Sequence, residues 1–188
     1  MTTLLEVIHR IHALPSSFDL LLESQLERHQ LPKHDLLLTP DKVSNRMFFI
    51  EKGLIQGYYL KEDKDISTGF MGEGQFVISP ISFFLQRPSF EYLELLEDSL
   101  LWSLTYQQLI SLYETYPAFN YVGRIITEQY YINSEVRTHN LRMLTADERY
   151  QWFISTYKPV LNRLSNKHIA SFLGLTPETV SRIRAKKQ

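Results

Sequence analysis

The chain has 188 residues, 44% of them hydrophobic and 13% aromatic, which suffices for one domain of ordinary size plus a small second one. It has no cysteine, which excludes disulfides, thiolate-bound zinc and cysteine-ligated iron–sulfur clusters, and its net charge is −1. No apolar run approaches the ~20 residues of a membrane-spanning helix, and the N-terminus carries no basic leader region, so a cytoplasmic protein without a membrane partner is expected.

The N-terminal part of the chain predicts helices and then a series of short strands. Apolar spacing indicates helices over residues 3–30, with a break at 14–17 and an end at Pro32. From residue 34 to 104 the pattern changes to short apolar or alternating runs separated by turn residues, which is typical of a β-sandwich or jelly roll. The predicted strands are residues 36–38, 47–50, 54–60, 66–70, 76–78, 92–96 and 100–104.

A long helix is predicted after the strands. Thr105 and Gln108 form a capping box that opens one helix, and Pro117 fits the first turn of a second helix that reaches about Leu144. Along this second helix, alternating steps of three and four residues indicate a coiled-coil seam, whose polar members would fix the register of a parallel homodimer. The alternative is one long helix packed on its own β-structure. The seam consists of Phe119, Val122, Ile126, Gln129, Asn133, Val136 and Asn140.

The last stretch of the chain predicts two short helices around a tight turn. A capping box at residues 145–148 first opens a supporting helix. Ser165 is a good N-cap for the next helix, and Gly174 ends it, because glycine adopts a left-handed C-cap without steric cost. Thr176 then caps the final helix, with Pro177 at its first position. This arrangement is that of a helix-turn-helix, which fits a DNA major groove.

Basic residues are concentrated at this end of the chain. Residues 160–188 carry six Lys or Arg and one Glu, a net charge of +5, whereas residues 1–159 carry 14 basic and 20 acidic residues, a net charge of −6. An acidic body with a basic end is expected when only the end meets phosphate. The alternative is an ordinary solvated tail.

A β-roll, a long connecting helix and a C-terminal helix-turn-helix together resemble the Crp/Fnr family of bacterial transcription regulators. The strongest motif is the run IASFLG at 169–174 followed by TPETVSR at 176–182, since a run E-T-[VL]-[SG]-R opens the recognition helix in that family. The resemblance implies an α+β fold with a cyclic-nucleotide-binding-like jelly roll and flanking helices. The implied division is a sensor domain at 1–116, a long dimerisation helix at 117–144 and a small all-α DNA-binding domain at 145–188.

The resemblance also implies which residues meet DNA. Glu178 and Arg182 correspond to the base-reading pair of the family. An arginine can donate two parallel hydrogen bonds to guanine, and a glutamate can accept one from the amino group of cytosine. The alternative for this pair is an ion pair along one helix face. The other expected contacts are Ser181 to bases and Thr176, Thr179, Arg184, Lys186 and Lys187 to phosphates.

Two departures from the family bear on the operator. Pro177 stands where the cyclic-AMP-binding receptor of the family has a base-reading arginine, so a different operator sequence is expected. The chain stops at Gln188, directly after the second helix, so the β-hairpin wing that commonly follows is expected to be absent. The expected partner is therefore a pseudo-palindromic DNA duplex, bound with fewer backbone contacts per half-site. RNA polymerase is the further partner that the resemblance suggests.

The sensor departs from the family more strongly. Members that bind cyclic nucleotides hold the phosphate on a short helix opening with Gly-Glu and use a downstream arginine. Here Ile78 and Ser79 replace Gly-Glu, the arginine position falls on Ser89, and Arg87 is displaced from it by two residues. Cyclic AMP binding is therefore expected to be absent or weak. An effector pocket for an unknown, less charged molecule would include Ser79, Phe83, Arg87 and Ser89, with nearby Phe84 and Phe90; packed core is the alternative for the aromatic residues.

No pattern in the sequence supports catalysis. There is no Gly-x-Ser-x-Gly elbow, phosphate-binding glycine loop or His-x-His metal pattern, so neither an enzyme nor a cofactor or metal site is expected. His9 and His12 are three residues apart, but we interpret them as surface residues. The main rival function is a cyclic-nucleotide- or small-ligand-binding signalling module whose terminal helices are only structural.

Overall fold

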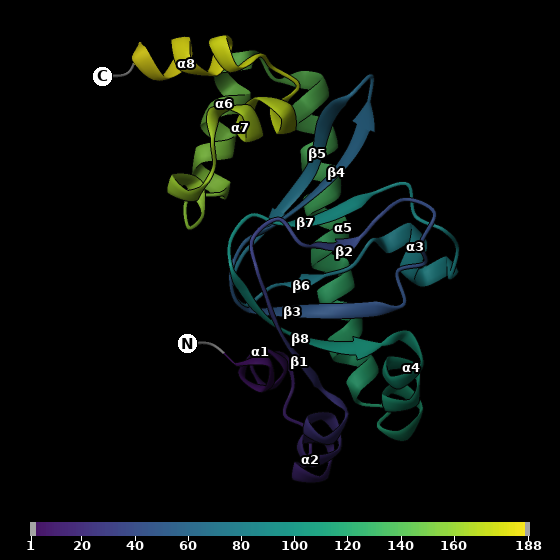
Figure 1. The fold of residues 1–188 in the computed structure, drawn as a ribbon. Coiled ribbons are helices and arrows are strands. Elements are labelled where there is room, and N and C mark those ends of the chain that lie inside the picture. The colour runs from purple at the N-terminus through teal and green to yellow at the C-terminus, as the bar shows by residue number, and fades with distance from the viewer. Residues whose placement is uncertain (1–2, 187–188) are drawn as a thin grey trace. The chain divides into compact units, whose positions relative to one another are not determined.

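The computed structural model describes residues 3–186, and Figure 1 labels its elements along the chain. The strands are β1 (Glu27–Leu31), β2 (Leu36–Leu38), β3 (Arg46–Lys52), β4 (Ile55–Lys61), β5 (Lys64–Met71), β6 (Phe76–Val77), β7 (Tyr92–Leu95) and β8 (Ser99–Thr105). The helices are α1 (Leu4–Ile11), α2 (Ser16–Gln25), α3 (Pro80–Leu85), α4 (Tyr106–Thr115), α5 (Phe119–Met143), α6 (Ala146–Thr156), α7 (Asn166–Leu173) and α8 (Pro177–Ala185), with a 3₁₀ turn at Leu161–Arg163.

The strands form two four-stranded sheets, ordered β1-β8-β3-β6 and β2-β7-β4-β5. Strand β8 pairs antiparallel with both β1 and β3, so that Ser103 lies opposite Glu27 on one side and Phe48 on the other. Side chains from both sheets fill the space between them and make one apolar core. Its buried members are Leu38, Phe48, Ile50, Ile55, Val77, Leu93, Leu95 and Leu101. The predicted jelly roll is confirmed.

The predicted helix over residues 3–30 is only partly correct. Helices α1 and α2 flank the break at 14–17 as expected, but residues 27–31 form strand β1. This segment carries Glu27, Arg28, His29 and Gln30, which give no apolar alternation of their own. It is a strand because its backbone pairs with β8, about 70 residues later in the chain, and tertiary pairing overrides weak local preference.

A second apolar cluster joins the N-terminal helices, α3, α4 and the start of α5. Phe18, Leu22 and Leu112 are fully buried in it, and the ring of Phe18 lies 4.8 Å from that of Phe119. The capping box predicted at Thr105 and Gln108 opens α4, with both reciprocal hydrogen bonds formed. This cluster fixes the first turns of α5 on the β-roll.

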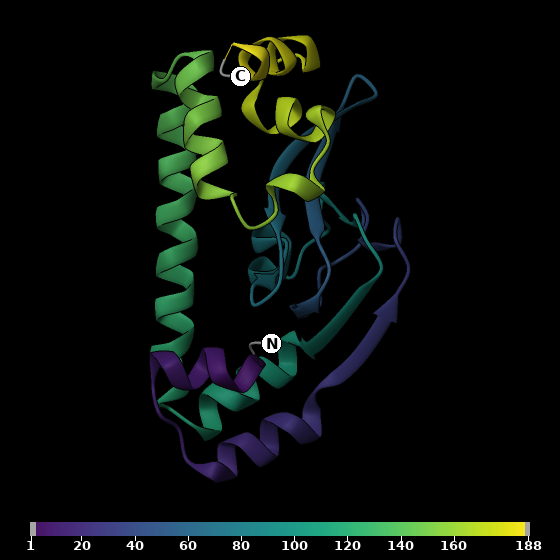
Figure 2. The ribbon, with the colours of Figure 1, turned by 90° about the vertical axis from the view of Figure 1, so that its left-hand side faces the viewer.

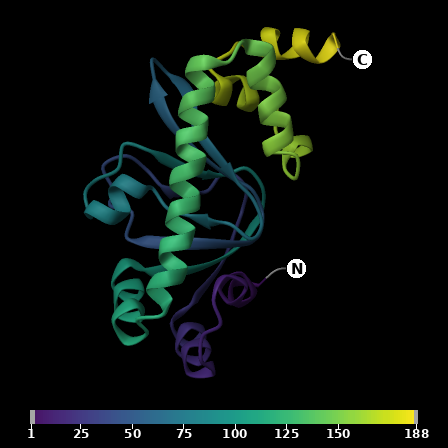
Figure 3. The same ribbon diagram turned by 180° about the vertical axis from the view of Figure 1, so that it is seen from behind.

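The described residues divide into two compact units. The first contains the chain up to Gly57 and residues Phe70–Glu128; the second contains Tyr58–Gly69 and the chain from Gln129 onward. Helix α5, the long green helix of Figure 3, is continuous over 25 residues. Its residues up to Glu128 belong to the first unit and those from Gln129 onward to the second. The second unit therefore includes the far end of the β4–β5 hairpin together with α6, α7 and α8. Within residues 3–186, no helix is long and apolar enough to cross a membrane.

Aromatic side chains form the core of the second unit. The ring of Phe172 lies 5.4 Å from Phe153, 5.1 Å from Tyr157 and 6.0 Å from Trp152. Burial raises the pKa of Tyr157 to about 12, so its hydroxyl stays protonated and neutral. This cluster packs α6 against α7, and α7 in turn supports α8.

Candidate nucleic-acid interface

The helix-turn-helix forms with the predicted caps. The Ser165 hydroxyl accepts a hydrogen bond from the His168 amide at the start of α7, and Gly174 ends that helix with φ of 63°. The Thr176 hydroxyl caps α8 by accepting from the Thr179 amide, and Pro177 occupies the first helical position. These local predictions are confirmed, because each signal acts within one helical turn.

One face of α8 is buried and the other is exposed. Val180 and Ile183 are buried against the rest of the unit, with at most 2% of their surface exposed. Glu178, Ser181 and Arg182 are exposed on the remaining face. An amphipathic helix held in this way presents its polar side chains outward as a rigid row.

Glu178 is poised as a hydrogen-bond acceptor. Its own backbone N–H and the Thr176 hydroxyl hold the pKa of its carboxyl below the usual value, so it stays ionised at neutral pH. Across the part of the chain that the structure describes, no ion pair joins Glu178 to Arg182. Both side chains are therefore available to a partner.

The Arg184 side chain, expected to contact phosphate, is already hydrogen-bonded within the protein. Its Nε donates to the Tyr150 hydroxyl at 2.9 Å, and its Nη1 donates to Asn166 Oδ1 at 2.6 Å. The Asn166 amide nitrogen donates in turn to Ser181 Oγ at 3.1 Å. This network ties α8 to α6 and α7. Of the two lysines expected at phosphates, Lys186 is exposed and Lys187 lies outside the described residues.

Asn166 is the residue that sequence reasoning missed. It lies at the start of α7 and bonds two side chains of α8 that were expected to meet DNA. No local sequence signal marks this role, because the α8 partners of Asn166 are 15 and 18 residues away in the chain. Thr176 and Thr179 are also engaged locally, with their hydroxyls 3.1 Å apart within the cap.

Three of the four residues expected to line the effector pocket, Ser79, Phe83 and Ser89, are buried. Ser79 and Ser89 are buried, and their hydroxyl oxygens lie 3.3 Å apart. Phe83 is fully buried in the helical cluster, 5.4 Å from the Tyr106 ring, so it is core as the alternative held. Arg87 is exposed, as are Phe84 and Phe90. Among the described residues, no hydrogen bond joins the Arg87 guanidinium to either serine.

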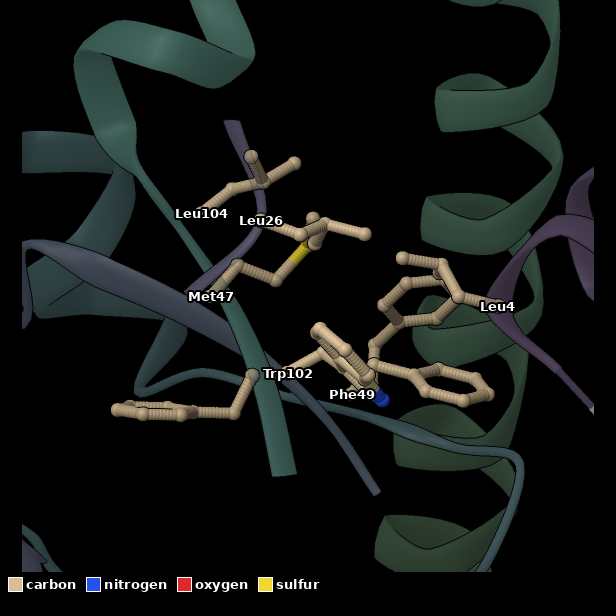
Figure 4. Close-up of a pocket in the computed structure, with 8 residues that line it drawn as sticks. Leu4, Leu26, Met47, Phe49, Trp102 and Leu104 are labelled. Atoms are coloured by element: carbon tan, nitrogen blue, oxygen red, sulfur yellow. The ribbon is translucent and has the colours of Figure 1, made fainter. Parts of the chain in front are cut away.

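The cavity in Figure 4 is apolar and too small for an effector. It has a volume of about 10 Å³, roughly the space of one water molecule. A second cavity of about 60 Å³ lies at β2 and β3, beside Ser44, Asn45 and Arg46. Neither includes the expected pocket residues. Their linings are Leu4, Leu26, Met47, Phe48, Phe49, Phe76, Trp102 and Leu104 for the first, and Leu37, Leu38, Val43, Ser44, Asn45, Arg46, Phe48 and Leu93 for the second.

The predicted seam of α5 is divided between burial and exposure. Phe119 and Val122 belong to the core of the first unit, and Ile126 packs against that core, as expected of a helix lying on its own β-structure. Further along, Gln129, Asn133 and Val136 are exposed, whereas Asn140 is buried. Ile132, one residue from the predicted row, is 53% exposed. The outward apolar row thus runs through Ile132 and Val136.

Histidines contribute to structure in the first unit. His9 Nε2 lies 2.8 Å from Asp19 Oδ1, and the His12 ring packs 5.5 Å from that of Tyr121. Among residues 3–186, no three His, Cys, Asp or Glu side chains gather where they could hold a metal ion.

A β-roll joined by a long helix to a C-terminal helix-turn-helix is the architecture of a class of bacterial transcription regulators. Residues 28–116 match the cyclic nucleotide-binding domain, and residues 163–183 match the bacterial regulatory proteins of the crp family. With both matches on this fold, the chain belongs to the Crp/Fnr family. No curated protein matches the chain significantly.

Several solved structures have a similar fold. The c-di-GMP responsive global regulator CLP from Xanthomonas campestris has a TM-score of 0.74 at 16% identity, covering 93% of this chain and 92% of that one. FixK2 from Bradyrhizobium japonicum has a TM-score of 0.76 at 18% identity, with 86% and 83% covered. A CooA mutant from Carboxydothermus hydrogenoformans has a TM-score of 0.69 at 17% identity, with 98% and 84% covered. At these identities the likeness shows the fold.

Proposed function

We propose that the protein is a homodimeric transcription regulator that reads a two-fold related DNA operator with α8. The observation that carries the proposal is the outward row of Glu178, Ser181 and Arg182 on a helix whose opposite face is buried. The proposed division is a sensor domain at 1–116, a connecting helix at 117–144 and a DNA-binding domain at 145–188. The match of residues 163–183 to crp-family regulators supports the assignment of the last part.

The chemistry of α8 suits a major groove. Arg182 would donate two hydrogen bonds to guanine O6 and N7, and ionised Glu178 would accept from a cytosine amino group. In a dimer, two such helices would enter successive major grooves about 34–36 Å apart. Arg184, held by Tyr150 and Asn166, would orient α8 and offer its remaining N–H groups to the backbone of DNA.

The effector of this regulator is proposed to be a molecule other than cyclic AMP. Ser79 and Ser89 bond to each other where a phosphate would need a cation, and Phe83 fills the adjacent core. A signal at the β-roll would change how the two α5 helices of the dimer pack, and this would change the distance between the two α8 helices.

Selection from a random pool of DNA duplexes tests the function. We expect the wild type to recover palindromic sites. Replacing Arg182 by Ala should cost about 1–3 kcal/mol of binding free energy on the selected site and relax the choice at one base pair of each half. Lys158→Ala is the matched control, because it removes one positive charge from an exposed position outside α8.

Two results would contradict the function. If the wild type binds no duplex at low ionic strength, the terminal helices are structural and the signalling-module alternative holds. If Arg182→Ala loses affinity equally for all sequences, Arg182 contacts phosphate and does not read bases.

A further inference from the structure

The end of the β4–β5 hairpin lies against the first helix of the helix-turn-helix. Residues 58–69 belong to the same compact unit as α7, and Figure 2 shows the hairpin end beside that helix. The hairpin turns at Glu62 and Asp63, which have φ of 51° and 57°. Two consecutive left-handed residues are the geometry of a type I′ turn, which keeps the two strands tightly paired up to the tip.

A partly buried cluster of hydrogen bonds holds the hairpin end on α7. The backbone N–H of Ser67 donates to Ser171 Oγ at 2.9 Å, and the Ser67 hydroxyl donates to the same oxygen at 3.1 Å. The Ser171 hydroxyl donates to the main-chain carbonyl of Asp65. Ser67 is fully buried, so its end of the cluster is shielded from competing water.

An arginine of α5 completes the attachment. Arg137 Nη2 donates to the Ser67 carbonyl at 2.8 Å, and its guanidinium lies 4.5 Å from the centre of the Phe172 ring. A cation over an aromatic face is a favourable contact that strengthens when it is shielded from water. The hairpin end is therefore fixed between α5 and α7 by contacts that do not depend on the side chain of Asp65.

The side chain of Asp65 instead neutralises a lysine on the surface of the helix-turn-helix. Lys167 Nζ lies 3.1 Å from Asp65 Oδ2. The lysine is 71% exposed and lies in the first turn of α7, one residue from Asn166, which bonds to Ser181 of α8. The first helix of a helix-turn-helix crosses the DNA backbone while the second enters the groove, so Lys167 lies where phosphate would approach.

We propose that the hairpin end, residues 58–69, is an autoinhibitory element that withholds Lys167 from DNA phosphate by pairing it with Asp65. The proposal rests on the DNA-binding function proposed above and adds a phosphate-binding residue on α7. An exposed ion pair is weak enough to be opened by a competing anion. Movement of β4 and β5 would then set how much of the positive charge of α7 is offered to DNA.

The test measures binding to a fluorescent duplex of random sequence over a series of salt concentrations. Asp65→Asn removes the charge and keeps the main-chain carbonyl that Ser171 bonds. We expect it to tighten binding about two- to five-fold, the range of one exposed ion pair. The plot of log affinity against log salt should become steeper by about 0.9, the contribution of one added phosphate contact.

Asp63→Asn is the matched control, because Asp63 is an exposed carboxylate on the same turn and forms no ion pair among the described residues. Asp63→Asn removes the same charge as Asp65→Asn does, but it releases no lysine. It should therefore leave the slope of log affinity against log salt unaltered. In a Lys167→Ala background, Asp65→Asn should have no more effect than Asp63→Asn.

Three outcomes overturn the autoinhibition: equal behaviour of the two asparagine variants, weaker binding by Asp65→Asn, or a full effect without Lys167. They are distinct from failure of the DNA-binding function. That failure would appear as no binding to duplex by the wild type and by Asp65→Asn alike at the lowest salt, which would overturn both proposals.

Discussion

Ser89 lies in a cluster of neutral hydrogen-bonding groups. Its hydroxyl accepts a hydrogen bond from the Glu91 amide at 2.9 Å and lies 3.3 Å from the Ser79 hydroxyl. These neutral groups satisfy one another. A phosphate brought here would be buried without a cation, and burial of an unpaired charge is unfavourable by several kcal/mol.

We therefore expect calorimetry to detect no saturable binding of cyclic AMP at millimolar concentrations. Arg87→Ala should behave as the wild type does. Arg87 is exposed, and among the described residues no hydrogen bond of its side chain directs it toward Ser79 and Ser89. Micromolar binding that disappears in Arg87→Ala would show that the loop rearranges to bring this guanidinium to the phosphate.

The sequence predicts the roles of residues whose partners are close in sequence. It does not predict the roles of residues whose partners are distant in sequence. Ser165, Gly174 and Thr176 act within one turn of helix, and all three caps form as expected. Arg184 was expected to be free for phosphate, but its partners, Tyr150 and Asn166, are 34 and 18 residues away. Helical spacing shows which face a residue is on, and it does not show what covers that face.

At the scale of elements, helices carry local sequence signals, whereas strand β1 depends on pairing with a distant part of the chain. Helices α4, α6 and α7 each begin with a capping box, a signal contained in four residues. At α6 the Thr145 amide and hydroxyl lower the pKa of Glu148, as expected of a carboxylate accepting both hydrogen bonds. Strand β1 has no comparable local signal and was predicted as helix, because only its pairing with β8 makes it a strand.

The turn between α7 and α8 depends on the left-handed backbone of Gly174. An added Cβ would come no closer than 3.7 Å to its nearest neighbour, Arg149 Nη1, so the cost of a side chain here is conformational. We expect Gly174→Ala to lower the free energy of unfolding by about 1–2 kcal/mol. Denaturant unfolding followed by tryptophan fluorescence would measure it, since Trp152 stacks on Phe172 in the same unit.

Gly174→Asn is the informative comparison, because asparagine adopts the left-handed conformation more readily than alanine. It should lose clearly less stability than Gly174→Ala does. Equal losses in the two variants would mean that steric contact with Arg149, and not the backbone conformation, requires glycine.

At the scale of the whole molecule, the proposed dimer depends on the exposed face of α5. The heptad pattern was visible in the sequence, but its first members are taken up by the core of the chain itself. Phe119 and Val122 pack with the N-terminal helices, so only the later part of the helix offers a face to a partner. Ile132 and Val136 are 53% and 43% exposed there, beside the hydrogen-bonded pair of Gln129 and Asn133.

We expect the double variant Ile132→Asp with Val136→Asp to be monomeric, because two facing carboxylates would be buried in the seam of a parallel pair. Sedimentation velocity would show the loss of the dimer, and affinity for a palindromic site should fall to that for a single half-site. Tyr131→Asp is the control: Tyr131 is 64% exposed but one residue away on the helix, about 100° around its axis from Ile132. If the double variant still sediments as a dimer, the interface lies elsewhere. The spacing of the two α8 helices would then not be set by α5.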